Sequence, residues 1–156
     1  MIHGMDEASS IANALGIILT RGFRNGLYRD VTADITEGLS EATYPVLSAL
    51  SRAVEPTSAA SLATEVGLDR SVVSRRAGEL IDAKLVTQES HPGDRRQALL
   101  SLTPAGQQAI SEARRRLDVA IAQHISNWTP TDRGLFAALL VRFTETALDV
   151  VPENRE

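Results

Sequence analysis

Residues 57–103 decide the fold, and they read TSAASLATEVGLDRSVVSRRAGELIDAKLVTQESHPGDRRQALLSLT. Thr57 is a good N-cap, and apolar residues recur at helical spacing from Ala59 to Val66, which predicts a short helix. Gly67 is expected to end this helix, because glycine readily adopts the left-handed conformation that often follows one. The stretch therefore begins with a capped helix and a tight turn.

A second helix and a hairpin are predicted after the turn. Asp69 is expected to cap this helix, whose pattern runs to about Ala83. Two helices joined by a short turn with glycine form a helix-turn-helix. Two strands follow at Leu85–Ser90 and Ala98–Leu102, with a charged loop over 91–97. A helix-turn-helix followed by a basic hairpin is a winged helix.

The second helix has one apolar and one polar side. At 100° per residue, its core side carries Val73, Ala77, Leu80 and Ile81. Its opposite side carries Ser71, Ser74, Arg75, Gly78 and Asp82, with Arg70 in the first turn and Arg76 on a flank. Because arginine pairs with guanine and serine contacts bases or phosphates, the candidate major-groove contacts are Arg70, Ser71, Ser74, Arg75 and Arg76. A solvated face is an equally weighted alternative for the helix alone.

The predicted hairpin tip is basic. Pro92-Gly93 signals a turn, and Asp94, Arg95 and Arg96 follow it. Two adjacent arginines on a protruding hairpin repel each other unless Asp94 or another anion offsets them. A narrow minor groove is such an anion and attracts arginine, so this tip favours DNA binding over a merely solvated surface.

The combined motif resembles the MarR (multiple-antibiotic-resistance regulator) family of bacterial repressors. The matching pieces, within about 39–110, are Leu62-Ala63, Val73-Ser74-Arg75, Leu80, Leu85-Val86, Asp94-x-Arg96 and Leu102-Thr103-x-x-Gly106. The resemblance implies a mainly α fold with a small β-wing, a winged helix-turn-helix in a six-helix dimer. It implies a homodimeric regulator, a repressor, on double-stranded operator DNA, with the second helix in the major groove and Arg96 in the minor groove.

Two positions depart from the family pattern. Lys84 stands where the family usually has glycine, so it either adopts the left-handed conformation at some cost or the helix ends differently. Pro45 falls inside an expected helix from Ser40 to Arg52, and it either kinks that helix or shifts its start.

The resemblance also implies control by a small molecule. Many family members release DNA when a small aromatic or anionic compound binds between the dimer helices and the DNA-reading lobe. Candidate lining residues are Arg21, Arg24, Tyr44 and His124, although each also fits a surface or packing role.

The remaining helices predict a dimer. We expect one helix over 8–29, a polar connection over 30–38, a long helix from Pro104 to about Ser126 capped by Thr103, and a last helix from Thr131 to about Val150. These helices are too apolar for one subunit to bury, so a two-fold dimer is expected. The expected dimer contacts include Ile11, Leu15, Leu135, Leu139 and Phe143. Residues 1–38 and 103–156 would then form the dimerisation region, and 39–102 the DNA-binding domain.

The run Arg114-Arg115-Arg116 is a cluster of charge on the long helix. We expect it to be a solvated face beside the dimer seam rather than a DNA contact.

Composition limits the function classes. The 156 residues are 43% hydrophobic and include no cysteine, which excludes disulfides, zinc–thiolate sites and thiol redox sensing. The net charge is −4, but six basic residues against four acidic ones give residues 70–96 a charge of +2, leaving −6 elsewhere. No apolar run approaches the ~20 residues that span a bilayer, and no secretory leader opens the chain, so we expect a cytoplasmic protein with no membrane partner.

Two other classes compete with a DNA-binding regulator. No phosphate-binding glycine loop, nucleophile elbow or metal-ligand spacing is present, and the three histidines lie far apart, so we expect no enzyme, cofactor or metal. A winged helix also serves as a protein–protein interaction module. Arginine on both the helix and the wing tip favours DNA, since a protein-docking face would expose more apolar or aromatic residues.

Overall fold

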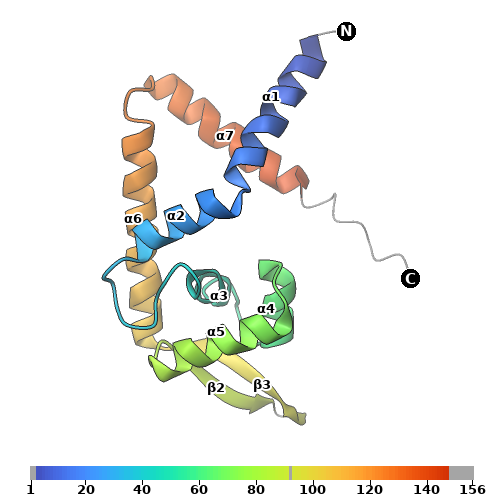
Figure 1. The fold of residues 1–156 in the computed structure, drawn as a ribbon, viewed down its shortest axis with the longest axis vertical. Coiled ribbons are helices and arrows are strands. Elements are labelled where there is room, and N and C mark those ends of the chain that lie inside the picture. The colour runs from blue at the N-terminus through green and yellow to red at the C-terminus, as the bar shows by residue number, and fades with distance from the viewer. Residues whose placement is uncertain (1–2, 92, 148–156) are drawn as a thin grey trace, which may run out of the picture. The chain divides into compact units, whose positions relative to one another are not determined.

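The chain forms helices and one small antiparallel sheet (Figure 1). The computed structural model describes residues 3–91 and 93–147. Its elements are α1 His3–Ile18, α2 Arg21–Thr32, α3 Tyr44–Leu50, β1 Thr57–Ser58, α4 Ala59–Val66, α5 Arg70–Asp82, β2 Val86–His91, β3 Asp94–Leu102, α6 Pro104–His124 and α7 Pro130–Ala147. The predicted class, mainly α with a small β-wing, is confirmed. The described residues hold seven helices where six were predicted.

Helices α4 and α5 form the predicted helix-turn-helix. The hydroxyl of Ser58 caps α4 by accepting a hydrogen bond from the N–H of Ser61 at 3.1 Å. Gly67 ends α4 in the left-handed conformation, with φ 65° and ψ 40°, as predicted. Asp69 occupies the N-cap of α5 with an extended backbone, although its side chain makes no capping hydrogen bond. The turn therefore sets the start of α5 where the sequence predicts it.

Strand β3 is longer than predicted, whereas β2 has the predicted length and begins one residue later. They are ordered β1-β3-β2, and all pairs are antiparallel. Thr57, the predicted cap of α4, instead pairs with Leu100 across β1 and β3. The predicted loop over 91–97 is largely strand, because β3 begins early and continues the backbone hydrogen bonding of the hairpin. An irregularity in register lies between Ser90 and His91.

The predicted helix over 8–29 is wrong, because two helices occupy this region. Thr20 has an extended backbone and caps α2, accepting a hydrogen bond from the N–H of Phe23 at 3.3 Å. Its hydroxyl also donates to the carbonyl of Ile17 at 2.8 Å. A threonine that serves both helix ends permits the break despite the continuous apolar pattern. Helix α2 then runs into the predicted polar connection and ends at Thr32.

Helix α3 is shorter than the predicted span of residues 40–52. Pro45 lies in its first turn, so proline shifts the start of the helix rather than kinking it. The buried hydroxyl of Thr43 organises the preceding turn: it donates to the carbonyl of Gly38 at 2.7 Å and accepts from the N–H of Ser40 at 2.9 Å. The predicted cap Ser40 therefore belongs to this turn.

Lys84 adopts the left-handed conformation, the first of the two predicted alternatives, with φ 61°. The adjoining backbone is held by Thr103. The Thr103 hydroxyl donates to the carbonyl of Lys84 at 2.7 Å, and the Thr103 N–H donates to the carbonyl of Leu85 at 3.1 Å. These bonds join the exit of α5 to the start of α6, whose predicted cap is confirmed by a hydrogen bond from the N–H of Gly106 to the Thr103 hydroxyl at 3.1 Å.

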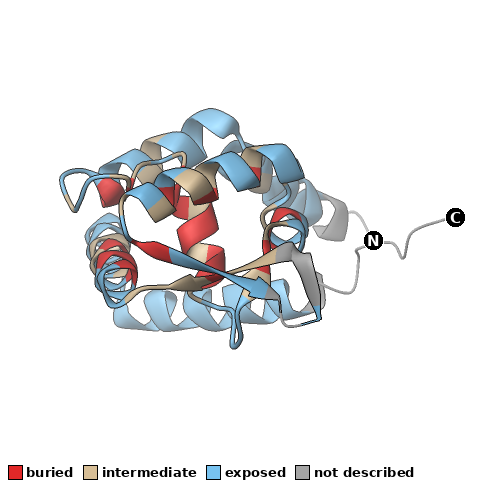
Figure 2. Cartoon of the chain, turned by 90° about the horizontal axis from the view of Figure 1, so that it is seen from below, coloured by how far each residue is buried: buried red, intermediate tan, exposed pale blue. Residues whose placement is uncertain are grey.

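The core lies beneath α5. Figure 2 shows the buried residues in red, on the sides of the helices and the sheet that face inward. Predicted core residues Val73, Ala77 and Leu80 are buried, while Ile81 is half-buried. Side chains from other elements complete the core, including Val46, Leu47, Leu62, Leu100 and Ile110. Burial of this apolar side fixes which face of α5 remains outside.

The chain divides into two compact units, residues 1–117 and 118–156. In the second unit the Thr129 hydroxyl caps α7 by accepting from the N–H of Asp132 at 3.1 Å, as predicted. The rings of Trp128 and Phe136 meet edge to face at 5.3 Å. The predicted end of the last helix near Val150 lies outside the described residues. No described helix has the length and apolar character to cross a membrane.

Candidate functional site

The outward face of α5 is polar and cationic. Ser71, Ser74 and Arg75 are exposed on it, and Arg70 is exposed in the first turn. The Arg75 side chain is 69% exposed, and its Nη1 lies 3.7 Å from Oε1 of Glu79, a long ion pair one helical turn away. Within residues 70–82, all of them described, no large apolar side chain is exposed. This face therefore lacks the apolar residues expected of a protein-docking helix.

Arg76 occupies a different side of α5 from Ser71 and Ser74. Its side chain is partly buried, and its Nε is buried without a hydrogen-bond partner among the described residues. Burial lowers the pKa of this guanidinium, and the neighbouring charges of Arg75 and Arg21 lower it further. Arg76 thus lies on the flank of α5 that faces Arg21, not on the outward face of the helix.

A hollow of about 510 Å³ separates α5 from the sheet. Arg70 and Ser74 line it from α5, and Gln88 lines it from β2. Sequence reasoning missed Gln88, although its place two residues after buried Val86 puts both on one face of the strand. The hollow places a third polar side chain beside two predicted DNA contacts.

The predicted wing-tip residues are described by their backbone alone. Asp94, Arg95 and Arg96 lie on β3, at the end of the hairpin away from α6. Their side chains lie outside the described part of the structure. Their predicted contact with a minor groove therefore stays a prediction.

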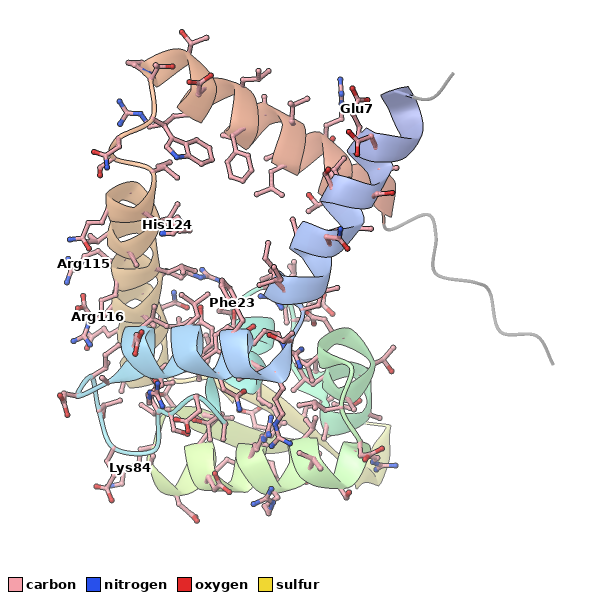
Figure 3. The ribbon with its side chains drawn as sticks, turned by 45° about the horizontal axis from the view of Figure 1, so that its top comes forward. Glu7, Phe23, Lys84, Arg115, Arg116 and His124 are labelled. Atoms are coloured by element: carbon pink, nitrogen blue, oxygen red, sulfur yellow. The ribbon has the colours of Figure 1, made fainter. Side chains whose placement is uncertain are left out.

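A pocket of about 770 Å³ lies among α2, α3, α4 and α5. Three of the four predicted effector residues line it: Arg21, Arg24 and Tyr44. His124, the fourth, belongs to the second unit, near the end of α6, and is not among the lining residues (Figure 3). The structure adds Tyr28 and two α5 residues, Arg75 and Arg76, to the lining.

Two tyrosines form an aromatic wall of the pocket. The ring centroids of Tyr28 and Tyr44 lie 4.9 Å apart, with the planes inclined at 46°. Burial raises the pKa of the Tyr44 phenol, so this group stays neutral at physiological pH. The two tyrosine rings therefore line the pocket next to its arginines.

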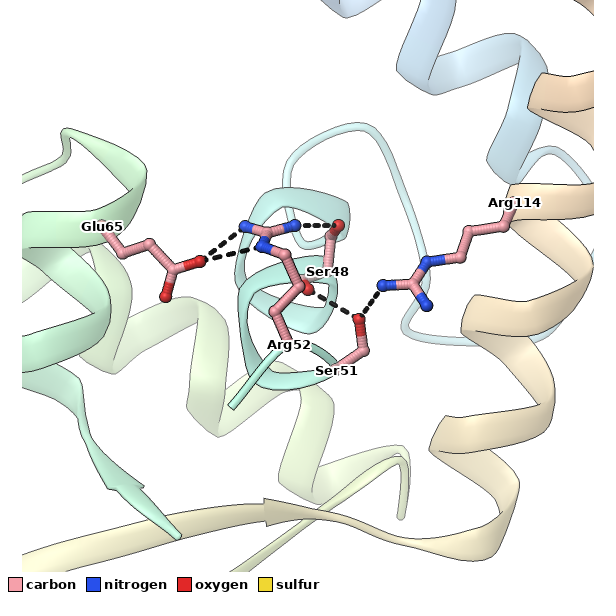
Figure 4. A network of polar contacts seen from close by, with 5 residues as sticks. All are labelled: Ser48, Ser51, Arg52, Glu65 and Arg114. Carbon is pink, nitrogen blue, oxygen red and sulfur yellow. Dashed lines mark hydrogen bonds and ion pairs between the residues drawn. The ribbon is translucent and has the colours of Figure 1, made fainter. Parts of the chain in front are cut away.

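Arg52 and Glu65 fix one side of the pocket (Figure 4). Arg52 donates from Nε and Nη2 to Oε1 of Glu65, at 3.0 and 2.7 Å, and from Nη1 to the Ser48 hydroxyl at 2.9 Å. This pair connects the end of α3 to α4. Sequence reasoning missed it because the two residues are 13 positions apart, and helical spacing does not predict contact between different helices.

The three consecutive arginines on α6 form hydrogen bonds with other residues of the same chain. Arg115 and Arg116 both donate to Glu112, at 2.7 and 2.9 Å from their Nε atoms, and Figure 3 shows their place on α6. Arg116 also donates to the carbonyl of Ala33, and Arg114 donates to the Ser51 hydroxyl. The carboxyl of Glu112 has a pKa lowered to about 2 by the bonds from Arg115 and Arg116.

Apolar side chains stand exposed outside the core. Of the predicted dimer contacts, Ile11, Leu135, Leu139 and Phe143 are exposed in the single chain, while Leu15 is half-buried. Others that the prediction did not include are Ile17, Ile18, Phe23, Phe136, Leu140 and Val141; Figure 3 shows Phe23 on α2. Exposed apolar groups in such number on these helices indicate an interaction surface on each unit.

The sequence model of the MarR family matches residues 37–97, which include the helix-turn-helix. A candidate transcriptional regulatory protein for the hcr operon of Thauera aromatica is 30% identical over 148 residues, covering 91% of this chain and 82% of that protein. The chain belongs to the MarR family. It is a transcriptional regulator with the winged-helix fold of that family.

Solved structures show the same MarR fold. A MarR transcriptional regulator from Methanosarcina mazei Go1 matches with a TM-score of 0.75 at 17% identity, covering 92% of this chain and 99% of that one. CouR from Rhodococcus jostii RHA1, solved bound to p-coumaroyl-CoA, matches with a TM-score of 0.67 at 23% identity, covering 92% and 97%. Among the described residues of our chain, no group of acidic residues or histidines is placed to hold a metal.

Proposed function

We propose that this MarR-family chain is a homodimeric repressor that binds palindromic operator DNA and releases it when an anionic aromatic effector binds. Helix α5 enters the major groove with Ser71, Ser74 and Arg75, and Arg70 contacts the backbone beside it. Arg95 and Arg96 of the wing reach the adjacent minor groove. Arginine is the side chain that both grooves favour.

The single observation that carries the DNA-binding proposal is the outward face of α5. It joins an exposed arginine to exposed serines and has no exposed large apolar group. Among the described residues Arg75 forms one ion pair, with Glu79 at the long distance of 3.7 Å, so its guanidinium keeps most of its donors for a base or phosphate. A local charge of +2 over residues 70–96 attracts DNA despite the acidic remainder.

A second copy of the chain is the occupant that we propose for the exposed apolar surfaces. Leu139 is 43% exposed and Phe143 42% exposed in the single chain, and both lie on one side of α7. Two-fold association covers the same surface on both copies. It also supplies the paired recognition helices that a palindromic operator requires.

The proposed effector site is the pocket lined by Arg21, Arg24 and Tyr44. Guanidinium groups bind carboxylates and phosphates, and the tyrosine wall accepts a flat ring. A ligand that is both aromatic and anionic matches both features. CouR, a structure with a similar fold, binds p-coumaroyl-CoA, which combines an aromatic ring with phosphate groups.

Footprinting on the DNA upstream of the gene that encodes this chain tests the proposal. We expect protection of two half-sites whose centres lie about 10 base pairs, or one helical turn, apart. Arg75→Ala should weaken the footprint, while the control Arg115→Ala, whose guanidinium is bound by Glu112, should leave it unchanged. Absence of any footprint, or a footprint that Arg75→Ala does not weaken, would contradict the proposed reading helix.

A further inference from the structure

The pocket beside α5 holds more positive charge than its own acids neutralise. Its lining includes five arginines, Arg21, Arg24, Arg52, Arg75 and Arg76, and two acids, Glu41 and Glu65. Glu65 is bound by Arg52, as Figure 4 shows, so it offers little to the others. Within the part of the chain that the structure describes, Arg21, Arg24 and Arg76 form no ion pair. The remaining positive charge calls for an anion of more than one charge.

Arg76 is the residue for which the missing anion matters most. Its Nε is shielded from solvent and has no acceptor among the described residues. A buried donor without an acceptor loses its bond to water and gains nothing in return. Arg75 and Arg21 lie near enough for their charges to disfavour the charged form of Arg76. An anion among these three groups would provide the acceptor and relieve the repulsion.

Arg75 belongs to both the pocket and the outward face of α5. It follows Ser71 by one helical turn, which places it on the polar face. It also lines the pocket together with Val72 and Arg76, the residues on the next side of the helix. With 69% of its side chain exposed, Arg75 can turn toward either side. The opposite flank of α5 carries Arg70, which lines the hollow beside the sheet instead.

We infer that the pocket binds a dianionic aromatic compound, and that this effector takes Arg75 away from the DNA, so that effector and operator compete for one guanidinium. The inference rests on the proposed function, because it requires α5 to contact DNA. Arg76 and Arg21 hold the anion, and the Tyr28–Tyr44 wall holds the ring. Regulation then needs no change in the position of α5.

Competition for one side chain has a thermodynamic signature. If the effector weakens DNA binding only by withdrawing Arg75, then removing Arg75 removes the coupling between the two ligands. Arg75→Gln should therefore bind DNA more weakly and no longer respond to the effector. Arg70→Gln is the matched control, since it removes an α5 arginine that does not line the pocket. It should also weaken DNA binding, yet keep the full response to the effector.

The probe is phenyl phosphate, with benzyl alcohol as its neutral counterpart, at constant ionic strength. Its phosphate carries nearly two charges at pH 7.5, since the second pKa of such a group is about 6. Calorimetry without DNA should show phenyl phosphate binding to the wild-type dimer, about tenfold or more weakened in Arg76→Gln, which loses charge-assisted hydrogen bonds. Benzyl alcohol should not bind. Equal binding of the two compounds, or no binding of phenyl phosphate, would overturn the assigned ligand class.

Fluorescence anisotropy with operator DNA gives the deciding comparison. At saturating phenyl phosphate, the apparent Kd for DNA should rise by roughly tenfold in wild type and Arg70→Gln, within the usual range of ligand coupling, and by less than about twofold in Arg75→Gln. An undiminished response in Arg75→Gln would overturn the competition while leaving the proposed function intact. Failure of the wild-type chain to bind operator DNA at all would instead contradict the proposed function.

Discussion

The backbone of Gly106 lies against the carbonyl of Leu85, so that a Cβ built on Gly106 would stand 2.0 Å from that oxygen. Gly106 is in the first turn of α6, and Leu85 follows the exit of α5. The close approach fixes the start of α6 against the segment that follows α5 through backbone atoms, which cannot move aside as a flexible side chain can.

Gly106→Ala should therefore destabilise the fold. Overpacking of this kind costs about 1–3 kcal/mol, and here the clashing atom is a backbone oxygen. Urea unfolding followed by circular dichroism measures the change. Gly78→Ala is the control, because its Cβ meets nothing within 4 Å and alanine is the better helix former by about 0.8–1.0 kcal/mol. Equal effects of the two substitutions would contradict the close contact.

Lys84→Gly should stabilise the fold by about 1 kcal/mol. The lysine holds φ at 61°, a conformation that costs a residue with a Cβ about 1–2 kcal/mol and glycine almost nothing, while glycine loses somewhat more backbone entropy on folding. Thermal unfolding of Lys84→Gly and Lys84→Ala separates backbone strain from the loss of the ammonium group. Only the glycine variant should gain stability, and a gain of equal size in the alanine variant would point to the charge instead.

The Glu112 carboxyl predicts a component of stability that is lost in acid. Its pKa is lowered from 4.5 to about 2 in the folded chain by hydrogen bonds from Arg115 and Arg116. Since the folded pKa lies below the ordinary value, the stabilisation is complete above pH 4.5 and disappears as the pH falls toward 2. Unfolding of wild type and Glu112→Gln should differ at neutral pH and converge over this window. A difference that stays constant down to pH 2 would show that the carboxylate bonds are not its source.

Leu139→Glu should weaken the proposed dimer by about 2 kcal/mol or more in each subunit, since it places a charge where the dimer would bury an exposed leucine. Light scattering at micromolar concentration should find wild type as a dimer and the variant shifted toward monomer. Arg133→Glu introduces the same residue at the polar start of α7 and should leave the dimer unchanged. A wild-type monomer at this concentration would contradict the two-fold assembly.

Local signals in the sequence predicted the helix-turn-helix well. Gly67 and Asp69 act on their immediate neighbours, so the turn before α5 lies where they place it. The break at Thr20 was not predicted, because an apolar helical pattern runs through it and one hydroxyl decides the outcome. The hairpin also extends beyond its strongest strand pattern, since pairing with the partner strand outweighs residue preference.

The candidate site was predictable only in part, for a similar reason. Arg75 is found by its place on a helical face, which needs only local spacing. The pocket requires knowledge of which helices meet, so the bond between Arg52 and Glu65 and the wall containing Tyr28 emerged from the fold. The same packing explains why Arg75 both lines the pocket and lies on the outward face of α5.

Anisotropy of labelled operator DNA over a salt series tests DNA reading by α5 and the wing most directly, with wild type, Arg75→Ala, Arg96→Ala and Arg115→Ala. Arg75→Ala should cost about 1–3 kcal/mol per half-site and relax sequence preference. Arg96→Ala should weaken binding to most sequences and reduce the salt slope by about one unit per subunit. Arg115→Ala should match wild type, because Glu112 already binds that arginine. If Arg115→Ala weakens binding as much as Arg96→Ala, or if none of the three changes the affinity, the assignment of α5 and the wing as the DNA-reading elements is contradicted.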